Sequence, residues 1–481
     1  MQTTLNRFCW ILTAAFLLAA AWTGIAKAQS ESDEYYELMR VFVDTFEEID
    51  KNYVNEVDKR RLVEAAVRGM LAELDPYSNY IGPNDIDVFT ESISQEFGGV
   101  GIRVNYDRQR RAIEVMTPLP GSPAYEAGIH SGDFIVEIDG KPVKDFELDQ
   151  ELETAVELLR GKPGEEVELG YLRGESKDIA RVKLKRDIIQ LETVLGYSYD
   201  DTGKWDLMLD DEQKIGYIRL TQFTKRSPAE VREALKNLRK DGMKGLILDL
   251  RTNPGGLLQA AVDISDMFIE EGVIVSTEGR NSPSRTWSAK RFGTFTGFPM
   301  AVLINNYSAS ASEIVSACLQ DHDRAVVIGE RSWGKGSVQD VIDLEGGKSA
   351  LKLTTASYHR PSGKNIHRFP NSKEDDEWGV MPNDGFVIDF TPQETLEYQR
   401  DRRERDVLGR TEEYQSSFVD RQLEVAREYL EKQLVEDTSG ADGAEEKKAA
   451  EENNPPAAND QEKKAAFRWP LIPMGWRGRA A

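Results

Sequence analysis

Apolar residues near the start of the chain recur every three or four positions. Between Ser32 and Leu74 this spacing predicts two amphipathic helices, and the run Asp75–Ser78 ends the second one. Two helices bury too little apolar surface to form a core of their own. We therefore expect residues 29–95 to form a helical segment that packs on the rest of the protein or on a second copy of itself.

The pattern changes twice farther along the chain. Residues 96–187 contain short strand-like runs separated by glycines, with one helical stretch from Asp149 to Leu159, which predicts a small β-rich domain. From residue 191 to residue 395, apolar strand-like runs alternate with helical stretches, which predicts an α/β core. The whole chain therefore has a mixed α+β / α/β fold class.

The C-terminal part is highly charged. Residues 396–435 have the pattern of a charged helix that is broken near Leu408. Residues 436–481 have the composition of a disordered acidic tail. The final FRWPLIPMGWRGRAA is aromatic and basic again, so we expect either a docking segment for a partner or a tail without structure.

Residues 1–28 have the pattern of a secretory signal peptide. Arg7 precedes an apolar run from Phe8 to Ala21, and Ala26-Lys27-Ala28 offers a cleavage pattern of small residues. An uncleaved N-terminal anchor is the alternative, because the run approaches the length that spans a bilayer. In both cases we expect an exported protein in the periplasm or another extracytoplasmic space, associated with the membrane if the segment is retained.

Composition and charge exclude several classes of function. The net charge of -23 argues against nucleic acid and anionic membrane surfaces as partners. The four histidines show no metal-ligand spacing, so we expect neither a metal nor a cofactor. Only Cys9 and Cys318 are present, and Cys9 lies in the predicted signal peptide, so the mature chain cannot form an internal disulfide.

The candidate chemistry lies between Asn305 and Gln339. Ser308, Ser310 and Ser312 alternate with small residues just before a helical stretch, and Lys335 follows between two glycines. A turn that enters a helix exposes a hydroxyl beside free N–H groups, as a serine nucleophile requires.

Two interpretations compete for Lys335. The run from Gly329 to Lys335 approaches a phosphate-binding loop, but Gly336 stands where such loops carry Ser or Thr. Alternatively, Lys335 is a general base, because burial lowers the pKa of a lysine amine. His322 is a weaker candidate base, since it lies in a polar turn.

The unit at residues 96–187 resembles a PDZ domain of the circularly permuted bacterial type. The resemblance rests on its opening glycines, on SPAYEAGIHSGDFIVEIDGKPV and on the helix before its last strands. PDZ domains bind the terminal carboxylate and backbone of a peptide. The resemblance therefore implies that Gly99, Val100, Gly101 and Ile102 bind a peptide.

Taken in order, the signal, the helical segment, the PDZ-like unit, DLRTNPGG, SASASEI and GERSWGKGSVQ resemble the carboxy-terminal processing proteases, a family of Ser/Lys serine peptidases. The resemblance implies a crotonase/ClpP-like α/β protease core with an inserted PDZ domain. It also implies that Ser310 is the nucleophile, that Lys335 is the base and that Gln339 orients the lysine amine. Asp321 resembles a position that is structural rather than chemical.

The implied reaction is acyl transfer. Ser310 attacks a peptide carbonyl, and Lys335 takes the proton and later delivers it to the leaving amine. The oxyanion is held by the N–H groups of Ala311 and Gly256, with Gly255 adjacent. The resemblance implies an endopeptidase that acts on proteins with apolar C-terminal tails. The alternative is a catalytically inactive PDZ scaffold that binds protein C-termini and recruits or regulates another protease.

Overall fold

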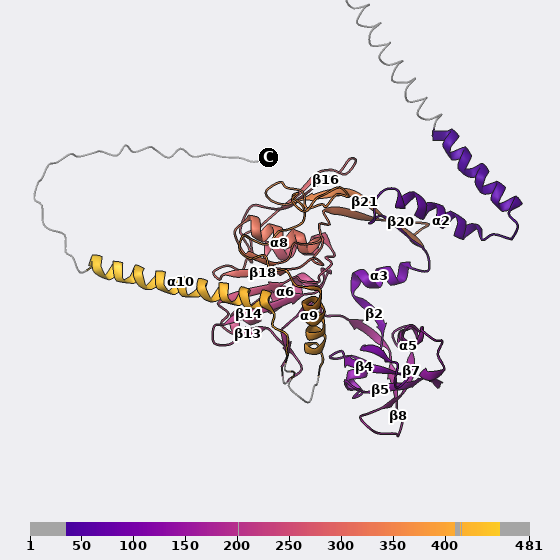
Figure 1. Cartoon of the computed structure of the whole chain (residues 1–481), viewed down its shortest axis with the longest axis horizontal. Coiled ribbons are helices and arrows are strands. Elements are labelled where there is room, and N and C mark those ends of the chain that lie inside the picture. The colour runs from indigo at the N-terminus through magenta and orange to yellow at the C-terminus, as the bar shows by residue number, and fades with distance from the viewer. Residues whose placement is uncertain (1–34, 201, 409–413, 415, 453–481) are drawn as a thin grey trace, which may run out of the picture.

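The computed structural model describes residues 35–200, 202–408, 414 and 416–452 (Figure 1). The predicted signal peptide and the terminal aromatic segment lie outside the described residues. Among the helices that are described, none combines the length and the apolar character needed to cross a membrane.

The N-terminal helical segment is present and joins the body of the protein through a strand. Its first helix covers residues 35–52, and its second, α2, covers Lys59–Ala72. The strand β1 (Asn79–Ile81) pairs antiparallel with β21 (Ser349–His359), and α3 (Ile86–Ser94) follows. The segment is therefore attached to the core at the end of the run Asp75–Ser78.

A small β-rich domain with its own apolar core follows. Its sheet has the strand order β3-β4-β5-β7-β8, with β6 beside β5. The elements are β3 (Ile102–Asp107), β4 (Ala112–Pro118), α4 (Pro123–Glu126), β5 (Phe134–Ile138), β6 (Lys141–Pro142), η1 (Val143–Asp145), α5 (Glu151–Leu159), β7 (Glu166–Leu172) and β8 (Ala180–Lys185). The antiparallel pair β2 (Glu96–Gly99) and β9 (Asp187–Gln190) closes the domain close to the predicted boundaries.

The α/β core is built on a sheet with the strand order β10-β14-β15-β18-β19, with β13 beside β14. The adjacent strands β14, β15, β18 and β19 are parallel. The strands are β10 (Val194–Leu195), β13 (Met208–Asp210), β14 (Ile215–Leu220), β15 (Gly245–Asp249), β18 (Met300–Ile304) and β19 (Val326–Gly329), and the short pair β11 (Ser198–Tyr199) and β12 (Trp205–Asp206) lies between β10 and β13 in the chain.

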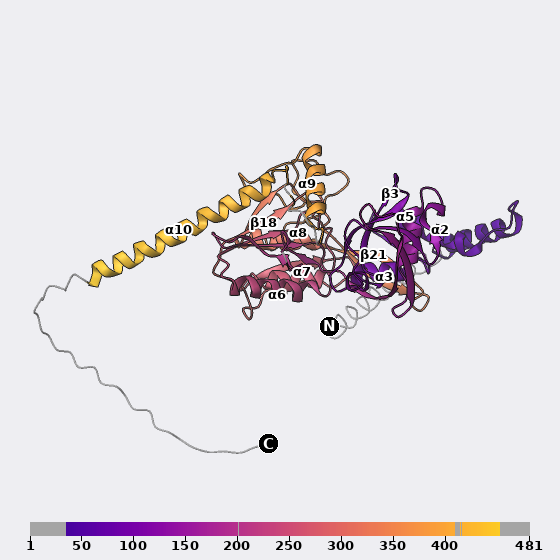
Figure 2. The same cartoon turned by 90° about the horizontal axis from the view of Figure 1, so that it is seen from below.

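Helices cover both faces of this sheet (Figures 1 and 2). Leu246 and Leu248 of β15 pack in the cluster that includes residues of α6 (Ser227–Lys240), α7 (Leu258–Asp266) and α8 (Ala311–Asp321). Ile247, between them, packs in the cluster that includes α10 (Arg421–Glu452). Successive strand residues point to opposite faces, and burial on both faces explains why these strands are continuously apolar.

A second sheet lies beside the core and carries the strand that follows Lys335. Its order is β1-β21-β16-β17, with β20 paired to β21. The additional strands are β16 (Val273–Glu278), β17 (Arg285–Ser288) and β20 (Ser337–Leu344).

The C-terminal helices differ in part from the prediction. α9 covers Pro392–Arg405, and α10 continues to Glu452, beyond the predicted start of the tail at residue 436. Alanine, glutamate and lysine favour helix even where apolar residues are few, and Pro455 and Pro456 follow. The composition rule considered only the lack of apolar residues and therefore placed the end of the helix too early.

Candidate active site

Three loops that carry the predicted site residues converge at one edge of the core sheet. They follow β15, β18 and β19, which are adjacent and parallel. The carboxyl ends of parallel strands meet at the same edge, where open α/β sheets bind their ligands. The glycine pair, the serines and Lys335 therefore lie in neighbouring loops although they are distant in the sequence.

Ser310 occupies a strained turn at the start of α8. Its backbone has φ 55° and ψ −111°, a conformation that a residue with a side chain rarely adopts. The N–H of Ser310 donates to Glu313 Oε2 at 2.7 Å, which holds the turn in place. The Ser310 side chain makes a hydrogen bond with Tyr358, whose pKa burial raises to about 12.

The two neighbouring serines have structural hydroxyls. Ser308 Oγ donates to the carbonyl of Leu250 at 2.8 Å, and Ser312 Oγ donates to the carbonyl of Asn253 at 2.9 Å. Both serines are completely buried. Their hydroxyl hydrogens are therefore committed to the loop after β15, which is a physical reason to prefer Ser310 as the nucleophile.

The glycine pair lies directly against the Ser310 turn. A Cβ atom at Gly255 would fall 2.8 Å from Ser310 Cβ and 2.9 Å from the nitrogen of Ala311, so only glycine permits this approach. The N–H of Gly255 donates to Asn253 Oδ1 at 2.9 Å and is therefore not available to an oxyanion. The predicted oxyanion donors are therefore reduced to the N–H groups of Gly256 and Ala311. Gly255 allows the loop after β15 to lie directly against the Ser310 turn.

Lys335 lies against an aromatic ring in a largely buried environment. Its Nζ is 5.0 Å from the centre of the Tyr77 ring. Burial, with a further contribution from the charge of Lys352, lowers the Lys335 pKa to about 8, while Glu313 and Asp75 act to raise it. At that pKa, a useful fraction of the amine is neutral near pH 7, as a general base requires.

Gly334 and Gly336, on either side of Lys335, pack closely against neighbouring segments of the chain. A Cβ at Gly334 would meet the side chains of Arg368 and Trp378, and one at Gly336 would meet the backbone of His367. Both glycines therefore allow the close approach of the segment from Arg368 to Trp378 and of His367 to the lysine loop. Trp333 is half exposed and donates its indole N–H to Tyr77 Oη.

Glu313 joins the serine turn to the lysine loop. Its carboxylate is completely buried and accepts four hydrogen bonds. The donors are the backbone N–H groups of Ser310, Gly334 and Lys335 and the hydroxyl of Ser332, at 2.6–2.9 Å. Burial raises the pKa of Glu313, and these hydrogen bonds oppose the effect. The arrangement fixes the two loops relative to one another.

This arrangement also argues against the phosphate-binding interpretation. The N–H groups of Gly334 and Lys335 donate to a carboxylate, so they cannot receive a phosphate. The chain continues from Lys335 into β20 and not into a helix. His322 caps the far end of α8, about 18 Å from Ser310 at 1.5 Å per residue over the 12 positions between them.

Two other polar predictions can be placed. His322 is not simply solvated, because its Nε2 makes a hydrogen bond of 2.8 Å with the carbonyl of Val273. Asp321 has the expected structural role: its two oxygens pair with the Arg360 guanidinium at 2.6 and 2.9 Å and tie α8 to the end of β21. Among the described residues, no cluster of His, Cys, Asp and Glu could hold a metal ion.

Gln339 lies on β20, four residues after Lys335, and its amide hydrogens are donated to two hydroxyl groups of the second sheet. Nε2 donates to Ser337 Oγ at 2.8 Å and to Thr354 Oγ1 at 3.2 Å. The hydrogen-bonding capacity that remains on this side chain is that of its carbonyl oxygen.

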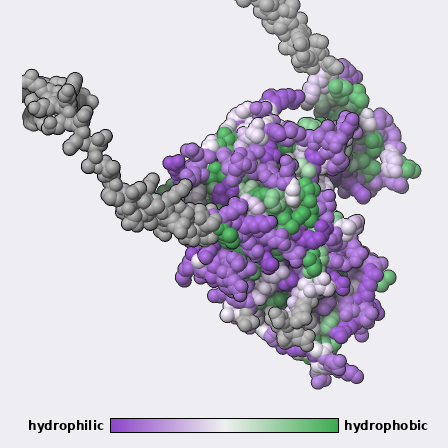
Figure 3. Space-filling model, turned by 60° about the vertical axis from the view of Figure 1, so that its left-hand side comes forward, coloured by the Kyte–Doolittle hydropathy of each residue, from purple (hydrophilic) through white to green (hydrophobic). Residues whose placement is uncertain are grey.

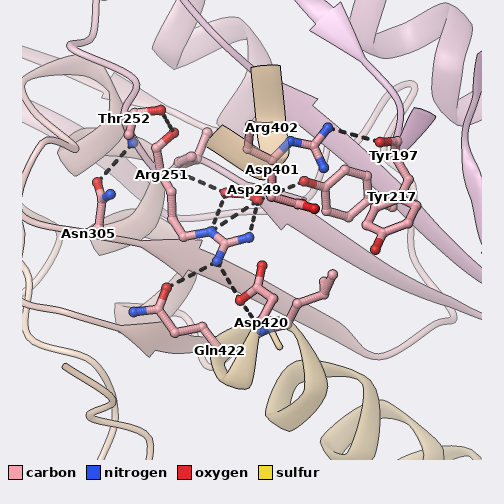
Figure 4. A network of polar contacts seen from close by, with 12 residues as sticks. Tyr197, Tyr217, Asp249, Arg251, Thr252, Asn305, Asp401, Arg402, Asp420 and Gln422 are labelled. Carbon is pink, nitrogen blue, oxygen red and sulfur yellow. Dashed lines mark hydrogen bonds and ion pairs between the residues drawn. The ribbon is translucent and has the colours of Figure 1, made fainter. Parts of the chain in front are cut away.

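A buried network supports the loop that carries the glycine pair (Figure 4). Arg251 is almost completely buried and pairs with Asp249 at 2.7 Å. It also donates to Asp420 at 2.9 Å and to Gln422 at 3.1 Å, at the start of α10. Burial acts to raise the pKa of Asp249, but the Arg251 guanidinium holds it below its usual value. The C-terminal helix therefore helps to fix the loop after β15.

The four predicted peptide-binding residues line one cavity of the β-rich domain. The cavity has a volume of about 480 Å³ and includes Gly99, Val100, Gly101 and Ile102 on one side. Val156 and Leu159 of α5 line the other side. Arg403 near the end of α9 also lines this cavity, with Asp406 and Val407 just after the helix, and the N–H of Leu408 donates to Thr117 Oγ1 at 3.0 Å.

Sequence reasoning missed three residues at the site. Tyr77, Glu313 and Tyr358 were not assigned a role, although each contacts Ser310, Lys335 or their loops. Glu313 had a local signal, because a glutamate three residues after a helix-capping serine is a common N-terminal pattern. Tyr77 and Tyr358 had none, since their approach depends on the tertiary fold.

Comparisons with known proteins match three parts of the chain. A model of peptidase family S41 matches residues 214–375, and a PDZ-domain model matches residues 114–173. A model described as the activating protease CtpB N-terminal domain matches residues 13–84. The last match begins within the predicted signal peptide.

Individual relatives span most of the chain. The carboxy-terminal-processing protease of Bartonella bacilliformis is 39% identical over 372 residues, which cover 75% of this chain and 80% of the relative. The carboxy-terminal processing protease CtpA of Bacillus subtilis is 35% identical over 344 residues, covering 71% and 69%. A solved structure, the photosystem II D1 C-terminal processing protease, is 28% identical with a TM-score of 0.39, covering 72% of this chain and 92% of that one. The sequence relationships show that this chain belongs to the carboxy-terminal processing proteases of peptidase family S41, serine-type peptidases, and carries a PDZ domain.

Proposed function

We propose that this protein is an exported endopeptidase in which Ser310 is the nucleophile and Lys335 is the general base. The observation that carries the proposal is the largely buried Lys335 amine, with a pKa of about 8, in a loop that Glu313 joins to the Ser310 turn. A lysine with its ordinary pKa of about 10.5 would be almost fully protonated at neutral pH.

The reaction proceeds through an acyl-enzyme. The neutral Lys335 amine removes the proton from Ser310 as its oxygen attacks the scissile carbonyl, and the resulting ammonium protonates the leaving amine. The N–H groups of Gly256 and Ala311 stabilise the oxyanion. Water, activated by Lys335, then releases the acyl group and regenerates the serine.

The PDZ domain selects substrates by their C-terminal tails. The apolar side of the 480 Å³ cavity, lined by Val156 and Leu159, suits an apolar C-terminal side chain. Backbone groups of Gly99 to Ile102 at the cavity suit a terminal carboxylate. Tail binding here would deliver the substrate to the serine turn of the core.

Two further features support export and self-association. The pattern of residues 1–28 supports export, and mass spectrometry of the N-terminus of the protein from the extracytoplasmic fraction tests it. The helix at 35–52 leaves apolar side chains such as Tyr36, Leu38 and Phe42 exposed, on a part that projects from the body (Figure 3). A second copy would cover this face, and light scattering of a variant that lacks residues 29–52 tests that.

The decisive experiment measures cleavage by protein that lacks residues 1–28. An unfolded substrate with an apolar C-terminus should be cleaved, and Ser310→Ala and Lys335→Ala should each reduce the rate at least a thousandfold. Ser308→Ala is the matched control, because its hydroxyl is committed to the carbonyl of Leu250. Tail binding without cleavage by the unmodified protein would favour the inactive scaffold instead.

A further inference from the structure

The run Asp75–Ser78 does more than end a helix. It leads into β1, which pairs with one edge of β21, while β20 pairs with the other edge. β20 begins at Ser337, two residues after Lys335. A single strand, β21, therefore lies between β1 and β20, and Tyr77 of the run itself reaches the Lys335 amine.

Three side chains form a chain of hydrogen bonds across these strands. Gln339 lies directly opposite Thr354 in the register of β20 and β21, and its Nε2 donates to Thr354 Oγ1 at 3.2 Å. Thr354 Oγ1 in turn donates to Asp75 Oδ1 at 3.2 Å. The N–H of Thr354 donates to Ser78 Oγ at 3.1 Å, which fixes the run against the strand.

The direction of each bond follows from the chemistry of the groups. Burial acts to raise the pKa of Asp75, but hydrogen bonds from Ser78 and Tyr77 leave it below its usual value, so the side chain is an ionised acceptor. Thr354 has one hydroxyl hydrogen, and Asp75 accepts it. The Thr354 oxygen can therefore only accept from Gln339, so the NH₂ end of Gln339 faces Thr354 and its carbonyl oxygen faces away.

We propose that Asp75, acting through Thr354, orients the Gln339 amide so that Oε1 accepts a hydrogen bond from the Lys335 amine. The inference rests on the proposed function and on the role that the family resemblance implies for Gln339, which is to orient the Lys335 amine. A flipped amide would instead donate to the lone pair of the neutral Lys335 amine, which must stay available for the Ser310 proton. Asp75 and Thr354 are positioning residues, and they make the N-terminal segment part of the catalytic machinery.

Substitution of Thr354 tests the chain with a matched pair. Thr354→Val removes the hydroxyl and keeps the shape, whereas Thr354→Ser keeps the hydroxyl. We expect Thr354→Val to lower kcat about tenfold, the effect of one lost hydrogen bond, with KM within twofold. Thr354→Ser should retain at least half of the wild-type kcat. An equal loss in both variants would overturn the inference, because it would indicate packing and not hydrogen bonding.

A double-mutant cycle tests whether Thr354 acts through Gln339. In a Gln339→Ala background, Thr354→Val should change the rate less than twofold, since the amide that it orients is absent. Both peptide cleavage and the rate of Ser310 labelling by a fluorophosphonate probe are measured, because labelling needs the activated serine but no PDZ ligand. A full tenfold loss in that background would overturn the inference. A wild-type protein that neither cleaves nor reacts would overturn the proposed function itself.

Discussion

Replacing Glu313 by glutamine should separate the serine turn from the lysine loop. The carboxylate accepts from three backbone N–H groups and one hydroxyl, and an amide can accept at only one of its two positions. An NH₂ group in place of Oε2 faces the N–H groups of Ser310 and Lys335. In place of Oε1 it faces the N–H of Gly334 and the Ser332 hydroxyl. The first orientation removes two acceptor contacts, and the second removes one, because the Ser332 hydroxyl can turn to accept from the NH₂ group. In both orientations the remaining contacts are made to a neutral amide in place of a charged carboxylate.

The structure sets the size of this effect. A hydrogen bond to a charged group contributes about 1.5–3 kcal/mol and one to a neutral group about 0.5–1.5 kcal/mol, so losing at least one contact and weakening the others costs about 3 kcal/mol. If the loops separate to relieve the conflict, the population of the assembled site falls about a hundredfold, at 1.4 kcal/mol per tenfold. We therefore expect kcat/KM for a peptide with an apolar C-terminus to fall about a hundredfold.

Glu330→Gln is the matched control for this experiment. Glu330 is also nearly buried and accepts backbone N–H groups, at 2.8 Å from Phe390 and 3.4 Å from Asn306, whereas the N–H groups of Ser310 and Lys335 donate to Glu313. It should keep kcat/KM within threefold of wild type. Circular dichroism and thermal unfolding confirm that both variants are folded. A folded Glu313→Gln variant with activity within threefold of wild type would refute the reasoning.

Four further predictions concern the base, its aromatic cover, the proposed oxyanion hole and the buried network. Because Lys335 must be neutral to act, and its pKa is about 8, kcat/KM should rise about tenfold per pH unit below pH 8 and level off above it; a flat profile between pH 6 and 8 would contradict this. Tyr77→Ala admits water to the Lys335 amine and should shift the rise of kcat/KM to higher pH, whereas Tyr77→Phe should leave the rise in place; the pH dependence of kcat/KM in the two variants tests this. Gly256→Ala should lower kcat at least tenfold, because a Cβ there would meet the carbonyl oxygen of Phe223 at 2.1 Å; steady-state kinetics would show an unchanged kcat if the fit were not required. Arg251→Met leaves Asp249 charged and unpaired in the core and should destabilise the protein by about 3–5 kcal/mol, measured by denaturant unfolding; a loss below 1 kcal/mol would contradict the assigned pairing.

Much of the fold could be predicted from periodicity. The parallel strands of the core are buried on both faces, so β15 and β18 appear in the sequence as continuous apolar runs followed by polar loops. The β-rich domain has alternating runs and closely spaced glycines. The extension of α10 past residue 436 could not be predicted in the same way, because its helix-favouring residues are also typical of disordered segments.

The candidate site was predictable only in part. The resemblance selected Ser310 among three similar serines, and the commitment of the Ser308 and Ser312 hydroxyls to backbone carbonyls is a tertiary contact that spacing cannot reveal. The same holds for the approach of Tyr77 to Lys335, which needs β1 to pair with β21. Sequence patterns assign residues to helices, strands and loops, whereas the pKa of Lys335 depends on the tertiary contacts that bury its amine.

The pairing of Arg251 with Asp420 and Gln422 has a consequence for the timing of biosynthesis. The glycine loop lies near the middle of the chain, but the groups that complete its support are made near the end. A ribosome that has synthesised the entire α/β sheet has not yet released the start of α10. The nascent chain therefore carries Ser310 and Lys335 before the loop of the proposed oxyanion hole has its full support, and we expect proteolytic competence only when translation is almost complete.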